Sequence, residues 1–566
     1  MQDAECTYVQ KKQRLSRISV EEVQTHGDKG INKAAEASEA PQKPKPNVQG
    51  QQLMNKIGIA DRCRFSFLLK FTRATGINQG YNCNRQFMTD EPHETFLEDD
   101  ASQANQHLSM LQDSPSRSDG GKTPSTRFNS TRRADRVTEA LRLQSSLIWD
   151  MFLPFCGQET ESTIVLADII SFFSPENILH FVDIFWDRWN PHCLIFHRPT
   201  FNIETCPPLL LANMVLMGGC TSSYKADRRI AKSLLDIAEE LVFSQPMFST
   251  ATRTVASKGI ANVGDTEERI HLIQISTLQA TYLICIMQKW EGSDGSKIRI
   301  QRDQFTKFVS ATRAMGLSRA RRGHQPITSD FDDRAWRAWI QKEEVNRMCN
   351  YTFLLDSAFV IFHNSFPRMA LQEMQIDLTS PEAWFQATSP TDFLAAIRSN
   401  PGLSEKHLSL VDSVRRLCNN SPEQSTEFLN GASKLNLFTI ATTLHGLIFH
   451  QKSSLYTLPL AENPLGKALD RWEVAWESNQ RVLTQASGDV NCTDKEQDGF
   501  MQYADEFAVL ARISLELSYL SSTEWSELVE GLSESSPRGA FATFDQAGMG
   551  PVGDLMLAVE NLSLNR

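Results

Sequence analysis

The chain has 566 residues, of which 41% are hydrophobic, enough for a large buried core, and its formal net charge is −11. The negative charge excludes general electrostatic attraction to nucleic acid or to an anionic membrane, so such binding would need a local basic patch. The 11 cysteines are scattered without a C-x-x-C pair, which indicates reduced thiols inside a cell rather than a secreted disulfide framework.

Residues 1–60 are predicted to form a disordered linker. Three prolines between residues 41 and 46 alternate with lysines, and proline at this density prevents helices and sheet ladders. A short basic run is formed by Lys11, Lys12, Arg14 and Arg17. Such a run is most often a solvated charge cluster, although its side chains could also contact nucleic-acid phosphates without reading sequence.

A short apolar segment and a second linker follow. Residues 61–87 contain the apolar stretch Phe65–Phe71, which ends at a turn signal before Gly76. Residues 88–130 are polar, acidic and rich in serine, and this composition predicts disorder. Everything before residue 131 is therefore predicted to tether a helical body.

From residue 131 onward apolar residues recur at helical spacing, and alternating strand patterns with hairpin turns are essentially absent. We expect an all-α fold, with one helical part over 131–366 and a second over 367–566. One helix is predicted over 226–242, with Glu239 and its acidic neighbours off a buried stripe that consists of Ile230, Leu234, Ile237 and Leu241. The most apolar run, 272–287, is too short and too polar for a membrane span and predicts a buried helix.

Candidate metal sites were sought among histidines, cysteines and carboxylates. His192, Cys193 and His197 lie close together, but prolines bracket them and His363 is distant, so packed histidines are the better interpretation. An all-α enzyme acting on a diphosphate would need clustered carboxylates to hold Mg²⁺. Asp332 and Asp333 lack a third carboxylate and predict a charged helix start, and Asp99-Asp100 falls in the linker.

No other catalytic pattern is present. The sequence has no glycine-rich phosphate loop and no G-x-S-x-G elbow. Trp336, Trp339 and Val345 could line a ligand pocket, but their helical spacing fits core packing better. The sequence therefore indicates a protein that is not an enzyme.

Four segments in a fixed order carry a family resemblance. They are Phe185–Phe201, Pro208–Gly219, Leu278-Gln-Ala280 followed by Arg313–Arg319, and Trp336–Arg347. Together they resemble the fungal-specific transcription factor domain, the helical regulatory region of fungal zinc-cluster regulators. The resemblance implies that the structural signature positions are Trp186, His197, Arg198, Pro199, Phe201, Gly316, Leu317, Trp336, Glu344 and Arg347.

The N-terminus resembles the end of that family's two-zinc, six-cysteine cluster. Cys6 would be the last metal ligand, followed by Tyr8 and the basic run at Lys11–Arg17. One thiolate cannot build a site that needs six, so we expect no cofactor in this chain and zinc only in a full-length form. Phe65–Phe71 also resembles a segment often found between the cluster and the regulatory domain.

The resemblance implies a nuclear regulator of fungal RNA polymerase II transcription, and three alternatives stay open. The chain could be a truncated zinc-cluster factor, a cluster-less co-regulator, or a helical metabolite-binding protein or enzyme without a recognisable motif. Expected partners are promoter DNA, reached through a restored cluster or another protein, and the transcription machinery or co-regulators. A small-molecule effector and a homodimer are possible further partners, and no membrane partner is expected.

Overall fold

The computed structural model describes residues 65–83, 139–155, 166–249, 264–316, 331–399, 408–419, 426–454, 463–486, 494–519 and 544–564. Over these ranges the protein is all-α, as predicted, with one isolated bridge between Asp377 and Ser409 and no sheet. The predicted linkers at 1–60 and 88–130 lie outside the described residues. Within the described ranges, no helix has both the length and the apolar character needed to cross a bilayer.

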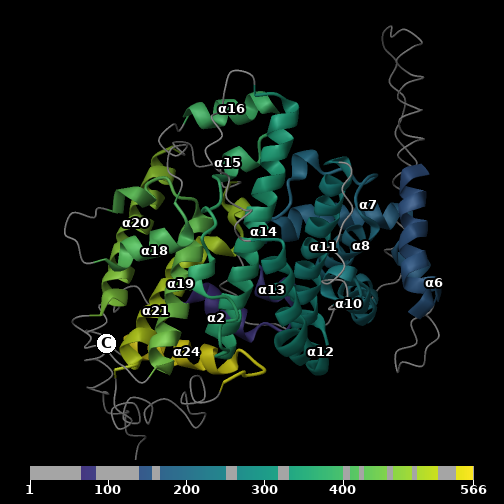
Figure 1. Ribbon diagram of the computed structural model, residues 1–566. Coiled ribbons are helices and arrows are strands. Elements are labelled where there is room, and N and C mark those ends of the chain that lie inside the picture. Colours follow the sequence, from purple (N-terminus) through teal and green to yellow (C-terminus); the bar gives the residue numbers. More distant parts are fainter. Residues whose placement is uncertain are drawn as a thin grey trace, which may run out of the picture. The chain divides into compact units, whose positions relative to one another are not determined.

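Most of the helices that build the fold are labelled in Figure 1. The first half of the chain contributes α2 (Ser66–Arg73), α3 (Ile77–Gly80), α6 (Leu166–Phe172), α7 (Pro175–Ile184), α8 (Pro208–Thr221), α9 (Lys225–Ser233), α10 (Leu235–Phe243), α11 (Gly264–Glu291), α12 (Asp294–Arg299) and α13 (Phe305–Ala314). The second half contributes α14 (Asp333–His363), α15 (Glu382–Phe385), α16 (Pro390–Ser399), α18 (Leu410–Cys418), α19 (Lys434–Ser453), α20 (Pro464–Ala486), α21 (Ala504–Leu517) and α24 (Gly550–Leu564).

The long helix α14 connects the two halves of the fold. It packs against α11 on one side and against α19 on the other, and α19 in turn packs on α20 and α21. Its start is set by Asp332, whose side chain accepts a hydrogen bond from the Ala335 N–H at 2.8 Å. Asp332 and Asp333 thus begin a helix, as the sequence indicated.

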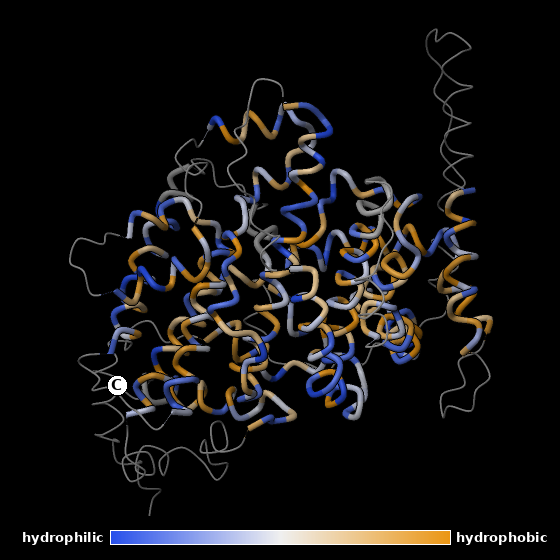
Figure 2. The backbone as a smooth tube through the Cα atoms, viewed as in Figure 1, coloured by the Kyte–Doolittle hydropathy of each residue, from blue (hydrophilic) through white to orange (hydrophobic). Residues whose placement is uncertain are grey.

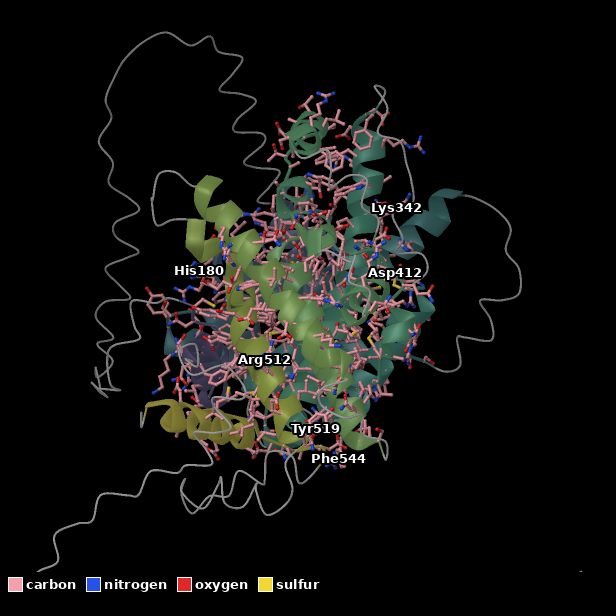
Figure 3. All side chains as sticks on the ribbon, turned by 90° about the vertical axis from the view of Figure 1, so that its left-hand side faces the viewer. His180, Lys342, Asp412, Arg512, Tyr519 and Phe544 are labelled. Carbon is pink, nitrogen blue, oxygen red and sulfur yellow. The ribbon has the colours of Figure 1, made fainter. Side chains whose placement is uncertain are left out.

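Most helices bury one face, and in Figure 2 hydrophobic and hydrophilic residues alternate along them. Helix α8 differs because nearly every residue in it is buried, which places it inside the core against α7, α11 and the chain after α7. Figure 3 shows side chains from neighbouring helices filling the interior between the ribbons. One large cluster of buried apolar side chains runs through both halves of the fold.

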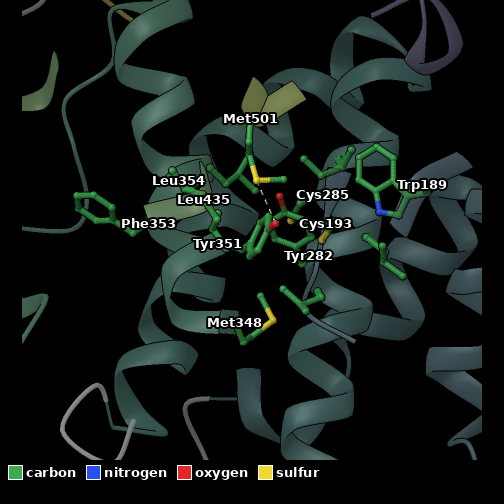
Figure 4. Packing of buried hydrophobic residues seen from close by; sticks show 14 of the residues in the cluster. Trp189, Cys193, Tyr282, Cys285, Met348, Tyr351, Phe353, Leu354, Leu435 and Met501 are labelled. Atoms are coloured by element: carbon green, nitrogen blue, oxygen red, sulfur yellow. Dashed lines mark hydrogen bonds between the residues drawn. The ribbon is translucent and has the colours of Figure 1, made fainter. Parts of the chain in front are cut away.

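A buried tyrosine links α14 to the segment that follows α7. The Tyr351 hydroxyl accepts a hydrogen bond from the Leu194 N–H at 3.0 Å and donates to Met501 Sδ at 3.8 Å (Figure 4). Tyr282 of α11 packs edge-on against the Tyr351 ring, with centroids 5.9 Å apart. These contacts join four distant parts of the sequence within the core.

The prediction of a single helix over 226–242 is wrong. The structure has two helices, α9 and α10, that meet at Leu234, where φ is −94° and ψ is −6°. The break rotates the second helix, so that Leu235, Ala238 and Val242 are buried while Ile237 and Leu241 are only half-buried. Glu239 consequently faces inward, at 2% exposure, where Arg299 Nε lies 2.7 Å from its Oε1.

The apolar segment before the second linker is part of the core. Helix α2 packs against α21 and α24 (Figure 1), and Phe67 stacks on Tyr503 with ring centroids 4.6 Å apart. Phe71 contacts Trp290 of α11 at 4.9 Å. A segment that precedes the main helical region in sequence is therefore buried within it.

Replacing Gly218 with alanine is expected to destabilise the fold. Helices α7 and α8 cross so closely at this glycine that a Cβ would overlap the Phe181 carbonyl oxygen. The overlap is with backbone, so the helices would have to separate, at a cost of about 2 kcal/mol in the free energy of unfolding. Chemical denaturation of the Gly218→Ala variant measures this cost.

Gly446→Ala is the matched control for that substitution. Gly446 lies within α19 and has no atom within 4 Å of the position a Cβ would take. Alanine is the better helix former, so this variant should gain about 0.5–1 kcal/mol. Equal effects of the two substitutions would contradict the close crossing of α7 and α8.

Candidate functional site

The His-Arg-Pro-Thr-Phe turn, residues His197–Phe201, is closed by one side-chain contact and one backbone hydrogen bond. His197 Nδ1 lies 2.8 Å from Thr200 Oγ1, and the Phe201 N–H donates to the His197 carbonyl at 3.2 Å. Pro199 suits the first turn of the short 3-10 helix η5 (Arg198–Thr200) because its φ is already fixed near the helical value. The motif therefore builds a compact turn.

An aromatic contact ties this turn to the end of α7. Helix α7 continues into a π-helical turn, η3 (Phe185–Trp189), which places the Trp186 ring against the Phe201 ring at 5.2 Å. The Arg198 guanidinium lies 5.6 Å from the Trp186 ring centre, a cation–π contact. Three of the signature positions thus pack on one another.

Helix α14 supplies the opposite wall. Glu344 Oε1 accepts a hydrogen bond from the His197 N–H at 3.1 Å. The His197 ring lies edge-on to Trp336, at 5.6 Å, and to Phe385 of α15, at 5.2 Å. The signature residues of the turn and of α14, which are far apart in sequence, are therefore in direct contact.

The same part of α14 also carries a fully buried ion pair. Arg347 Nε donates to Glu343 Oε1 at 2.9 Å, and both side chains are 0% exposed. The guanidinium also donates to the carbonyls of Leu194, at 3.3 Å, and Ser380, at 2.8 Å, and stacks 4.0 Å from the Phe385 ring centre. Arg347 therefore joins α14 to two separate segments of the chain.

A cavity of about 450 Å³ lies beside the turn. Its walls come from the turn, the start of α8, the stretch of α11 around Gln279 and the stretch of α14 around Glu344. The Gln279 side chain is 4% exposed, and its Nε2 donates to the Ile195 carbonyl at 3.0 Å. A concave site of this size that combines apolar walls with polar groups is typical of small-ligand binding.

Burial controls the charges at this site. It lowers the pKa of His197 to about 4, with the nearby Phe385 and Ala387 carbonyls acting in the opposite direction, so the ring is neutral at physiological pH. Burial also raises the pKa of Glu344 to about 7, against the effect of the His197 N–H. The Glu344 carboxyl therefore changes charge within the physiological range.

The remaining predicted positions divide into two groups. Gly316 follows α13 with φ at 84°, a left-handed conformation that suits glycine, and its N–H donates to the Arg313 carbonyl at 2.9 Å. Outside the described residues lie Leu317, Cys6, Lys11, Lys12, Arg14 and Arg17.

Three residues that contribute to this site were not predicted from the sequence. Gln279 lies within the Leu278-Gln-Ala280 segment, and Glu343 stands four residues before Arg347, so spacing was an available signal for both. Phe385 had no such signal because it reaches the site only through the tertiary fold.

The candidate metal residues are dispersed in packed surroundings. The His192 ring stacks against Phe500 at 6.0 Å, and burial lowers its pKa to about 4. His363 Nδ1 contacts the Gln546 carbonyl at 2.8 Å, and Cys193 is fully buried. Across the described residues, no group of three or more His, Cys, Asp or Glu side chains could hold a metal ion.

A second hollow, of about 480 Å³, is lined by acidic residues of α10. Its carboxylates are largely engaged, because Arg299 pairs with Asp236 at 2.9 Å and with Glu239 at 2.7 Å. Glu240 also lines this hollow and is exposed. These contacts describe an ion-pair network that holds α12 on α10.

Comparisons with known proteins found a family model and two relatives. A family model described as fungal specific transcription factor domain matches residues 182–473. "Transcription factor verF" of Penicillium polonicum is 30% identical over 410 residues, which cover 70% of this chain and 54% of that protein. "Zinc finger protein zas1" of Schizosaccharomyces pombe is 20% identical over 225 residues, which cover 39% of this chain and 22% of that protein. The chain thus spans just over half the length of the first relative, and no solved structure matches it significantly.

Proposed function

Because the chain belongs to the family of proteins with a fungal specific transcription factor domain, we propose that it is a nuclear regulator of fungal RNA polymerase II transcription. The observation that carries the proposal is the family match over residues 182–473, which includes the signature turn and α14. In this structure the two signature segments meet through His197 and Glu344. The helical body is the regulatory part of the protein.

Promoter DNA is reached in one of two ways. A longer form would carry a complete zinc cluster, with Cys6 as its last ligand and zinc as its structural metal. Alternatively, the chain acts as a cluster-less co-regulator that a partner protein brings to DNA. The name of the second relative, a zinc finger protein, supports the first arrangement, over 39% of this chain.

The cavity beside the turn is the proposed effector site. Its support is the mixture of apolar walls with Gln279 and Glu344, and the position of the signature residue His197 at its edge. An occupant that contacts both α11 and α14 would stabilise one relative position of these helices, which is how a ligand changes the output of a helical domain.

A reporter experiment tests the regulatory role independently of the zinc cluster. The full chain is fused to a heterologous DNA-binding domain and expressed in fungal cells with a promoter that carries the matching sites. We expect a severalfold change in reporter transcription relative to the DNA-binding domain alone. Unchanged transcription would contradict the proposal.

The route to DNA is tested by chromatin immunoprecipitation of the unfused chain. Association with promoters that persists after loss of its interacting proteins would contradict the co-regulator form. The transcript's 5′ end and the sequence upstream of Met1 decide whether five further cluster cysteines are encoded.

A further inference from the structure

The chemistry of the cavity can be defined further, on the premise of the proposed effector site. Two side chains of its inner wall hold the same short backbone segment: Gln279 donates to the Ile195 carbonyl, and Glu344 accepts from the His197 N–H. The two anchoring points are two residues apart. Gln279 and Glu344 therefore both line the cavity where it adjoins residues 195–197.

Each of these two side chains has one oxygen to which no described residue donates a hydrogen bond. The amide of Gln279 uses its nitrogen in the bond to the Ile195 carbonyl, and no described residue donates to its oxygen. Glu344 uses Oε1 for the His197 N–H, and no described residue donates to its Oε2. A bound group with two or three N–H donors would satisfy both oxygens.

The cationic side chain that lines the cavity, Arg337, is more than half exposed and is paired with a carboxylate. Its Nε lies 2.7 Å from Asp333 Oδ2. His197 is neutral at physiological pH because burial lowers its pKa to about 4. A ligand with a negative charge would therefore meet the Glu344 carboxylate, and the lining cation Arg337 is already paired with Asp333.

The rest of the lining includes polar side chains, among them Thr205 and Gln341, as well as an apolar part. Phe201, Leu210, Ile273 and Ile340 come from the turn, α8, α11 and α14, respectively. Ile273 is 57% exposed, which is unusual for a large aliphatic side chain beside a cavity. A hydrocarbon chain laid along these residues would remove apolar surface from water.

We propose that the cavity binds a small amphipathic amine, with its ammonium group directed at Glu344 and Gln279 and its hydrocarbon part along the apolar wall. The ammonium supplies both the missing positive charge and the donors for the two acceptors. The hydrocarbon part sets how far the ligand extends toward the turn.

Binding of such a ligand depends on pH in a defined direction. Burial raises the pKa of Glu344 to about 7, and an ammonium group prefers the ionised carboxylate. Affinity should therefore increase as the pH rises through about 7, with proton release on binding below that pH. A neutral alcohol of the same length should show no such increase.

Isothermal titration calorimetry with hexylammonium and hexanol tests the proposal. For the unmodified full chain at pH 8, hexylammonium should bind at least about tenfold more tightly than hexanol, the size of one charge-assisted hydrogen bond. The preference should shrink at pH 6. Equal affinities, or a preference for the alcohol, would overturn the proposal without any variant.

Three variants test whether hexylammonium binds in this cavity. Glu344→Gln should abolish the preference for the amine, whereas Glu240→Gln, which removes the same charge from the second hollow, should retain it. Ser276→Phe fills the cavity from α11 and should weaken both ligands. If Glu240→Gln removes the preference as well as Glu344→Gln does, the amine is attracted by the overall negative charge and the proposed site is wrong.

The reporter experiment separates this inference from the proposed function. If the fused chain regulates the reporter but hexylammonium does not bind preferentially, the amine site is overturned while the regulatory role stands. Suppose instead that hexylammonium binds through Glu344 but reporter transcription stays unchanged both with and without hexylammonium. The amine site then stands and the regulatory role is contradicted.

Discussion

Arg347→Met should lower the free energy of unfolding by about 3–5 kcal/mol, the typical cost of removing one partner from a buried ion pair. Arg347 and Glu343 are both 0% exposed, so water cannot replace the lost cation beside the carboxylate. The substitution also removes the donors to the Leu194 and Ser380 carbonyls. Methionine keeps a similar chain length, so most of the loss is electrostatic rather than a cavity.

The control for this prediction is Arg481→Met in α20. Arg481 also pairs with a glutamate four residues earlier, Glu477, at 3.1 Å, but its side chain is 74% exposed. This variant should change stability by less than about 1 kcal/mol. Urea denaturation of both variants measures the difference, and similar costs would show that the burial of Arg347 has no special role.

A double-mutant cycle isolates the charge pair. Glu343→Leu combined with Arg347→Met removes both buried charges, so the double variant should be more stable than the sum of the single losses predicts, by at least about 1 kcal/mol. Additive losses would indicate that the carbonyl contacts of Arg347 dominate over its pairing with Glu343.

Glu506→Ala should release α2 from the core and lower the free energy of unfolding by about 3 kcal/mol. The first residues of α2 have no capping side chain of their own. Glu506 of α21 replaces it, accepting hydrogen bonds from Ser66 Oγ at 3.0 Å and from the N–H groups of Phe67, at 3.0 Å, and Leu68, at 2.9 Å. Alanine would leave the buried N–H groups of Phe67 and Leu68 without an acceptor.

Hydrogen exchange locates the effect of Glu506→Ala. The amides of α2 should lose protection more than those of α19, because the substituted carboxylate contacts α2 directly. Asp554→Ala, at an exposed position in α24, is the control and should cost less than about 1 kcal/mol. Uniform loss of protection across the chain would contradict a specific role for Glu506 in docking α2.

The docking of α2 has a consequence for regulation. Helix α2 follows the predicted linker that carries Lys11, Lys12, Arg14 and Arg17, so it is the described segment nearest in sequence to the proposed DNA-proximal end. Its capping group belongs to α21, at the other end of the described chain. A change in the packing of the C-terminal helices would thus act directly on the segment that leads to the linker.

Periodicity alone was enough to predict the all-α class and the helix over 272–287, which forms part of α11. Asp332 marks the start of α14 because a capping carboxylate acts on the N–H groups of its own helix, a local interaction that sequence displays. The break at Leu234 was not predicted, since one continuous stripe and two helices rotated at a break give similar spacing over 17 residues.

The signature positions were recognised from the order of their motifs, but their roles came from contacts between segments. His197 and Glu344 are 147 residues apart, and Glu506 caps a helix 438 residues before it. Sequence spacing carries information about neighbours within a helical turn or two, so it identified the turn, the helices and the family resemblance. The cavity, the buried Arg347 pair and the docked α2 depend on which helices pack together, and burial by those neighbours is also what raises the pKa of Glu344 to about 7.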